Sequence, residues 1–465
     1  MLFHFAEVRH YAEVRGLQPV PAMPYSYFPQ GGEVLMTLAY IPGGQAAAQM
    51  VNPLFFALSL SLLYALARRL GLGRPAAVIG VVAAAGIPFL HWTGGSFKND
   101  FALVLYQLGA LYCFLRHRKE RRDHWIYVGV FLLASSFGVK HTAVFGAVPL
   151  GLLYLTAVWR RPRLLAMCLL IGITVGFHWH ARTYQLTGNP LYPRAAADAG
   201  AAVEPRRGDR PPAYLLYLMY PWVTHFKGTQ TFESPSNNPC GIFLVLFAPL
   251  FLWVRRKKWS DAVLICVFAV GVHLLYLGYV WLIVRYAIVP FCILAVLTAS
   301  RLTAFYESGG RFIKGSLLAA LAYSFLFALL PTMISEINAP QLLYFAGRLD
   351  REQYLRQTLT YYPSIEYLWA SVPHDAWILT VNNAARGYAP SPGRYHFATA
   401  KGRTADVIGT TTGYLAERDY DYAVIPTMMT RRFEELIAER YEPQREHTDD
   451  EYTVFRLRKR AGTGL

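Results

Sequence analysis

Long apolar blocks separated by short polar breaks occupy the chain from residue 45 to about residue 335. A helix that crosses a membrane needs about 20 mostly apolar residues. The blocks that approach this length are residues 45–67, 75–92, 99–115, 124–139, 142–158, 163–181, 239–254, 261–280, 284–300 and 313–334. We therefore predict a mainly α-helical, polytopic membrane protein with about ten transmembrane helices.

Beyond residue 335 the pattern changes to short mixed segments that are typical of a water-soluble domain. Residues 376–381, 422–426 and 452–458 have the composition of strands, and residues 431–441 have the period of an amphipathic helix. We predict a small soluble α/β domain, which contains no GxGxxG, P-loop or HExxH motif. The predicted divisions of the chain are 1–44, 45–334 and 335–465.

The formal net charge of +16 suits either a nucleic-acid-binding surface or the basic loops of a membrane protein. The connections between the predicted helices alternate between the two sides of the membrane. Those on one side hold eighteen cations, whereas the short turns on the other side hold only Lys98, Lys140 and Arg285. The eighteen are Arg68, Arg69, Arg74, Arg116, Arg118, Lys119, Arg121, Arg122, Arg160, Arg161, Arg163, Arg255, Arg256, Lys257, Lys258, Arg301, Arg311 and Lys314. Because cytoplasmic loops carry the positive excess, we predict a multi-pass protein of a bacterial inner membrane with no nucleic-acid partner. Residues 1–44, the loop 182–238 and the C-terminal domain then lie outside the cytoplasm.

The first segment, which this orientation places on the outer side, begins with MLFHFAEVRHYAEV. It contains no apolar stretch that would carry it across a membrane. We therefore expect a further helix upstream of Met1, so that the N-terminus of this chain is truncated. The rest of the segment is rich in aromatic residues, Pro and Gly, with a short helix expected over 33–40.

Cysteine and histidine spacings give no metal-binding framework. The cysteines have neither zinc-type nor disulfide-type spacing, and the C-terminal domain contains none. His178 and His180 are two residues apart, so on a helix they would not share a face. No metal site is predicted, and a requirement for a divalent metal ion stays open.

Cations at the outer ends of the helices are the first candidates for chemistry. Lys140 and His141 lie at the tip of a tight helical hairpin, and Arg285 with Tyr286 borders another block. All four suit a simple anchoring role at the membrane interface. They also suit a site for the phosphate of a lipid headgroup, which Lys binds well as a point charge.

Carboxylates on the same side are the second group of candidates. Asp100 opens a helix, where the macrodipole alone favours an acid, but it also suits a catalytic acid or base. Glu7, Glu13 and Glu33 accompany His4 and His10 in the first segment. We expect most of these to be solvated, with Glu7 or Glu33 as a further catalytic candidate.

The order of these features resembles the GT-C superfamily of polytopic glycosyltransferases. The likeness is to bacterial relatives of protein O-mannosyltransferase and lipid A aminoarabinose transferase. The matching stretches, in order, are FHFAEVRHYAEVRGL, SYFPQGGEVL, MVNPLFFAL, SFKNDFALV, SSFGVKHTAV, TGNPLYP, VRYAIVP, LYFAGRLDREQYL and DYDYAVIP.

The resemblance implies transfer of a sugar from a polyprenyl-phosphate donor, normally with inversion, to an unidentified glycan, lipid or protein acceptor at the outer membrane face. It implies that Asp100 is the second outer-loop acid of the family, and that Lys140 and Arg285 lie near the lipid phosphate. Glu33 follows the Pro-containing first-loop segment. The Asp that usually serves as base precedes a segment matched here by LFHF, and would lie before Met1.

Two other functions compete with catalysis. A lipid-linked-sugar flippase would have polar residues along the middle of several spans. A non-catalytic, lipid-linked-sugar-binding protein of envelope glycan assembly would keep the fold without turnover.

Overall fold

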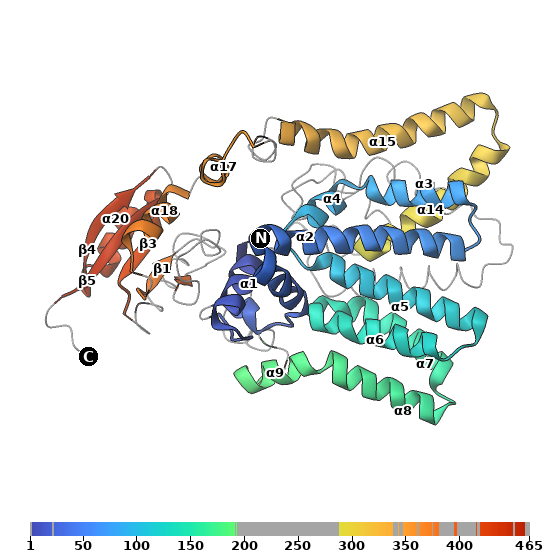
Figure 1. Ribbon diagram of the computed structural model, residues 1–465, viewed down its shortest axis with the longest axis horizontal. Helices are drawn as coiled ribbons and strands as arrows, with labels where there is room; N and C mark the ends of the chain where they lie inside the picture. Colours follow the sequence, from blue (N-terminus) through green and yellow to red (C-terminus); the bar gives the residue numbers. More distant parts are fainter. Residues whose placement is uncertain are drawn as a thin grey trace, which may run out of the picture. The chain divides into compact units, whose positions relative to one another are not determined.

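Long helices fill the described apolar blocks, and a small sheet forms near the C-terminus (Figure 1). The computed structural model describes residues 2–20, 23–190, 192, 288–337, 343, 347–359, 362–373, 375–380, 395–397, 415, 419–449 and 452–460. The chain divides into two compact units. The helical unit comprises residues 28–35 and 45–333, and the sheet unit comprises residues 1–27, 36–44 and 334–465.

Every predicted span that falls on described residues contains helix. The helices are α2 (Gly31–Arg69), α3 (Arg74–Ala85), α4 (Pro88–Gly95), α5 (Asp100–Glu120), α6 (His124–Val139), α7 (Val144–Val158), α8 (Pro162–Ile171), α9 (His178–Thr187), α14 (Ile288–Ser308) and α15 (Arg311–Ile337). The blocks 239–254 and 261–280 lie outside the described residues. A π-helical turn, Gly172–Gly176, joins α8 to α9, and a 3-10 turn, His141–Ala143, precedes α7.

Two described helices are long and apolar enough to cross a membrane, α2 and the segment His141–Val158. The number rises to four if the bent pair α3–α4, at 70°, and the bent pair formed by Pro162–Gly176 and α9, at 45°, each count as one span. The number of about ten transmembrane helices therefore stays a prediction. Helix α2 begins well before the predicted position 45, and Gly44 interrupts it with φ 63° and ψ −159°. A positive φ of this kind costs glycine little.

Small residues let the helices of the bundle approach closely. Gly80 of α3 faces Val296 and Ala299 of α14, and a Cβ on this glycine would lie 3.3 Å from both residues. Such small-residue contacts are the common device for packing helices in a membrane. Some buried polar groups in the bundle bond to the backbone; Tyr154 Oη, for example, donates to the Ala110 carbonyl at 2.7 Å.

With each bent pair taken as one unit, successive helices of the bundle run in opposite directions, so their connections gather at two ends (Figure 1). At one end lie the connections that follow α2, α5, α7 and α14, which contain the described basic loops. There Arg161 Nη1 donates to Asp123 Oδ1 at 2.7 Å, and this bond lowers the pKa of the Asp123 carboxyl. At the other end lie the start of α5 and the end of α6.

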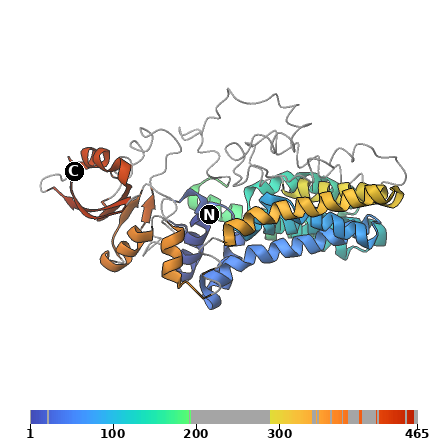
Figure 2. The ribbon, with the colours of Figure 1, turned by 90° about the horizontal axis from the view of Figure 1, so that it is seen from above.

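The sheet unit contains five described strands in the order β2-β1-β3-β5-β4. They are β1 (Ile378–Thr380), β2 (Tyr395–Phe397), β3 (Tyr422–Pro426), β4 (Tyr441–Thr448) and β5 (Tyr452–Lys459). β1 is parallel to β2 and β3, whereas β5 is antiparallel to β3 and β4. Helices α18 (Tyr362–Ser371) and α20 (Thr430–Ile437) cover opposite faces of the sheet (Figure 2). The unit also contains α1 (Leu2–Val14) and α17 (Arg351–Thr358).

The predicted strands of this unit are present, but the predicted helix 431–441 is too long. Helix α20 ends at Ile437, and Tyr441 already begins β4. The sequence YEPQREHT of β4 shows no apolar alternation, because β4 is an edge strand with a largely exposed face. Charged residues and a proline such as Pro443 are tolerated at such an edge, which is why the pattern hid this strand.

Candidate active site

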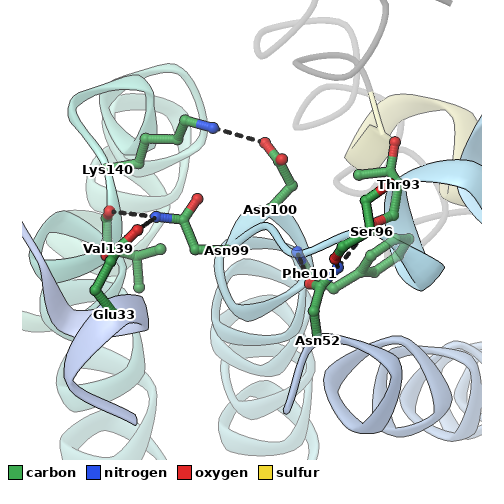
Figure 3. Close-up of polar contacts among 9 residues, drawn as sticks. All are labelled: Glu33, Asn52, Thr93, Ser96, Asn99, Asp100, Phe101, Val139 and Lys140. Atoms are coloured by element: carbon green, nitrogen blue, oxygen red, sulfur yellow. Dashed lines mark hydrogen bonds and ion pairs between the residues drawn. The ribbon is translucent and has the colours of Figure 1, made fainter. Parts of the chain in front are cut away.

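Two candidates that the sequence could only treat separately form an ion pair in the helical unit. Lys140 Nζ lies 2.8 Å from Asp100 Oδ1, across 40 positions of sequence (Figure 3). Asp100 is the first residue of α5, and Lys140 follows α6 in an extended conformation with φ −164° and ψ 144°. Their side chains are 3% and 17% exposed, respectively. Each charge offsets the cost of keeping the other away from water.

A neighbouring amide ties together the segments that carry this pair. Asn99 Nδ2 donates to Glu33 Oε1 at 2.9 Å and to the Val139 carbonyl at 3.4 Å (Figure 3). Glu33 and Asn99 are 1% and 4% exposed. The start of α2, the residue before Asp100 and the residue before Lys140 therefore meet at one buried amide group.

A second buried amide, Asn52 of α2, organises the loop that leads to Asp100. Its Nδ2 donates to the carbonyls of Thr93, Gly94 and Ser96 at 2.6, 3.1 and 3.0 Å. Its Oδ1 accepts from the Phe101 amide at 3.4 Å (Figure 3). Sequence reasoning missed both Asn52 and Asn99 as site residues. The available signal was the presence of an amide inside or beside an apolar block, where a polar group needs a partner.

His141 contacts aromatic rings beside Lys140. Its ring centroid lies 4.9 Å from that of Phe28 and 5.4 Å from that of His180. His180 Nδ1 is 3.1 Å from the Pro190 carbonyl oxygen, whereas His178 lies against Trp179 with ring centroids 5.1 Å apart. The structure thus places His180, but not His178, next to a predicted phosphate-binding residue.

Two of the three acids of the first segment, Glu7 and Glu33, are more buried than expected. Glu7, in α1 of the sheet unit, is 1% exposed, and its Oε2 lies 3.9 Å from His4 Nδ1. His4 and His10 are 6% and 7% exposed. The expectation of solvated groups is therefore wrong for Glu7, His4 and His10, and also for Glu33. It agrees with the structure for Glu13, whose side chain is 43% exposed. The buried residues lie on the inner faces of packed helices, a property that spacing alone does not reveal. Arg285 and Tyr286 lie outside the described residues.

A family model for dolichyl-phosphate-mannose-protein mannosyltransferase matches residues 36–181, a stretch that includes both Asp100 and Lys140. Among solved structures, the chain is similar to ArnT from Cupriavidus metallidurans in the apo state. The TM-score is 0.63 at 13% sequence identity, over 98% of this chain and 92% of that chain. No curated protein matches the sequence significantly.

The chain therefore has the fold of a membrane glycosyltransferase. The matched family model and the likeness in fold both support the resemblance to the GT-C superfamily seen in the sequence.

Proposed function

We propose that the chain transfers a sugar from a polyprenyl-phosphate donor to an acceptor at the outer face of a bacterial inner membrane. The observation that carries this proposal is the contact between Lys140 Nζ and Asp100 Oδ1 at 2.8 Å. It unites a cation suited to a phosphate with a carboxylate suited to a hydroxyl proton. The orientation rests on the basic excess in the opposite loops.

The ion pair suggests how donor binding would prepare the site. A donor phosphate competes with Asp100 for the Lys140 ammonium group, and when it wins, the carboxylate is released. The acceptor hydroxyl oxygen then attacks the anomeric carbon while the bond from this carbon to the phosphate oxygen breaks. Asp100 takes the hydroxyl proton, and Lys140 stabilises the charge on the departing lipid phosphate. Direct displacement of this kind inverts the anomeric configuration.

Other residues have supporting roles in this proposal. His141, beside Lys140, would contact the same lipid phosphate. Arg285 and Tyr286, which lie outside the described residues, are assigned to this phosphate only from their place in the sequence. The loop 182–238 and the C-terminal domain, both outside the cytoplasm, select the acceptor. Exchanging these segments with those of a relative would then change the acceptor that is used.

The proposal is tested with the purified chain in lipid nanodiscs. Polyprenyl-phosphate-linked sugars and an envelope lipid extract are supplied, and release of polyprenyl phosphate is measured. Asp100→Asn and Lys140→Ala should each lower turnover by about 100-fold or more. Ser61→Ala, at an exposed position of α2, should leave turnover unchanged. Wild-type turnover by the Lys140 variant would remove the phosphate-binding role.

The competing functions make different predictions in the same preparation. A flippase needs a polar path through the spans, yet Gln107 Nε2, deep in α5, is engaged with the Ala143 carbonyl at 3.0 Å. Movement of a fluorescent polyprenyl-phosphate sugar across proteoliposomes, without transfer, would favour the flippase. Binding of polyprenyl phosphate with neither transfer nor movement would favour the non-catalytic protein.

A further inference from the structure

We infer that Asn99 and Glu33 form a positioning pair that sets the reach of Lys140 to Asp100. In this arrangement Glu33 acts through Asn99 and does not accept the substrate proton. The inference rests on the proposed function for its kinetic consequence, but its structural consequence can be measured without turnover.

The Asn99 amide lies between the two segments that carry Asp100 and Lys140. Asn99 directly precedes Asp100, and its Nδ2 contacts the carbonyl of Val139, which directly precedes Lys140. The same nitrogen donates to Glu33 Oε1 at 2.9 Å. A primary amide has two N–H donors, so one group can hold both acceptors at once. Any movement of Asn99 therefore shifts both ends of the ion pair.

Helix α2 begins in direct contact with these segments. A Cβ on Gly32 would lie 2.5 Å from Asn99 Cβ, and a Cβ on Gly31 would lie 2.7 Å from the Gly138 carbonyl oxygen. Only residues without a side chain allow this approach. The glycine pair brings the Glu33 carboxylate to Asn99 and presses the start of α2 against the end of α6.

The carboxylates of Glu33 and Asp100 have different partners. In Figure 3 the Glu33 carboxylate meets the Asn99 amide, whereas the Lys140 ammonium group points to Asp100. Glu33 is 1% exposed and receives a directional bond from a neutral donor. A fixed hydrogen-bond acceptor fits this setting, and an amide carbonyl oxygen at position 33 would accept the same bond from Asn99.

Kinetic measurements on the full chain in nanodiscs separate positioning from proton transfer. Asn99→Ala and Glu33→Ala should each lower kcat by about 10- to 100-fold, with little change in the KM for the donor, because the reacting groups lose their alignment. Glu33→Gln should stay within about threefold of the wild type, since its amide oxygen accepts the same bond. A proton acceptor at position 33 would instead be lost in both variants.

An exchange of donor and acceptor provides a second test. Asn99→Asp places two carboxylates together and should be as impaired as Asn99→Ala. Combining it with Glu33→Gln restores the bond between the two side chains with donor and acceptor exchanged, but not the bond to the Val139 carbonyl. A kcat of the double variant above that of Asn99→Asp alone supports a direct bond between these side chains, whereas purely additive losses would argue against it. Because recovery requires a folded chain, the test also answers the concern that single variants misfold.

A readout independent of turnover is acylation of Lys140 by a water-soluble amine-reactive ester, followed by mass spectrometry. The contact with Asp100 should slow this reaction, and Asp100→Asn provides the rate of the released lysine. Asn99→Ala and Glu33→Ala should approach that rate, while Glu33→Gln and Ser61→Ala should react like the wild type. This pattern in a chain without transfer would keep the inference and refute the proposed function.

Two results would overturn the inference. One is an Asn99→Ala variant with the kcat and the acylation rate of the wild type. The other is a Glu33→Gln variant as inactive as Glu33→Ala, which would return Glu33 to the role of a proton acceptor.

Discussion

The helical unit and the sheet unit use charged residues in different ways. Asp100 and Lys140 of the helical unit are largely buried, with the Asn99 amide beside them. In the sheet unit, Arg431 and Glu435 pair with side chains that are 92% and 65% exposed. A buried pair is costly to break, whereas a surface pair contributes little. A charge retained inside the bundle therefore calls for a functional explanation, whereas an exposed pair such as Arg431 and Glu435 does not.

The largest expected effect comes from breaking the buried pair. Lys140→Met should destabilise the chain by about 3–5 kcal/mol, because Asp100 loses the ammonium group that compensates its charge. Adding Asp100→Asn should recover most of this loss. The matched change in the sheet unit, Arg431→Met, should cost less than about 0.5 kcal/mol. Thermal unfolding of the full chain in detergent measures all three, and similar losses at both sites would erase the contrast.

A smaller effect is expected where backbones approach each other in the helical unit. Gly32→Ala should cost about 1–3 kcal/mol, because the new methyl group would lie 2.5 Å from Asn99 Cβ. Gly151→Ala is the control, since nothing lies within 4 Å of a Cβ there. Its higher helix propensity should stabilise α7 by up to about 1 kcal/mol. The same melting experiment should therefore give shifts of opposite sign.

In the sheet unit, a loss of stability of similar size is expected when a partly buried hydrogen bond is removed. Tyr367 Oη donates to Glu446 Oε2 at 2.6 Å, and its ring stacks on His447 at 5.0 Å. Burial, then the bond to Glu446, raises the pKa of Tyr367 to about 12, so the phenol remains a donor until the pH rises to that value. Tyr367→Phe should cost about 1 kcal/mol. Faster hydrogen exchange in β4, with α20 unchanged, would show the loss.

The smallest effect should come from the exposed acids of the sheet unit. Hydrogen bonding from Lys459, opposed by burial and assisted by Arg440, lowers the pKa of the Asp419 carboxyl. Its contribution to stability is therefore present above the ordinary pKa of Asp, about 3.9, and is lost as the pH falls through the lowered value. Asp419 is 51% exposed, so solvent screening keeps this contribution small. Hydrogen exchange of β5 between pH 5 and pH 3 should depend less on pH in Asp419→Ala, and an unchanged profile would contradict this.

Helices and strands with a regular pattern of apolar residues were predicted from the sequence, and those without one were not. The apolar blocks and the strands at 422–426 and 452–458 were found because burial on one or both faces leaves a periodic record. The kink at Gly44 and the polar edge strand β4 were not found. A glycine needs no particular neighbours to adopt a positive φ. An edge strand with an exposed face buries few apolar residues, so its sequence shows no apolar alternation.

By itself the sequence determined the class of the molecule, the blocks that form its described helices, and the presence of Asp100 and Lys140 beside them. These properties are local, since they depend on hydropathy, charge and residue type along the chain. Only the tertiary structure decided that Asp100 and Lys140 touch, that Glu33 is buried against Asn99, and that Asn52 holds the loop before α5. Such contacts join positions roughly 40 or more residues apart, and they arise from how helices pack, which no single segment encodes.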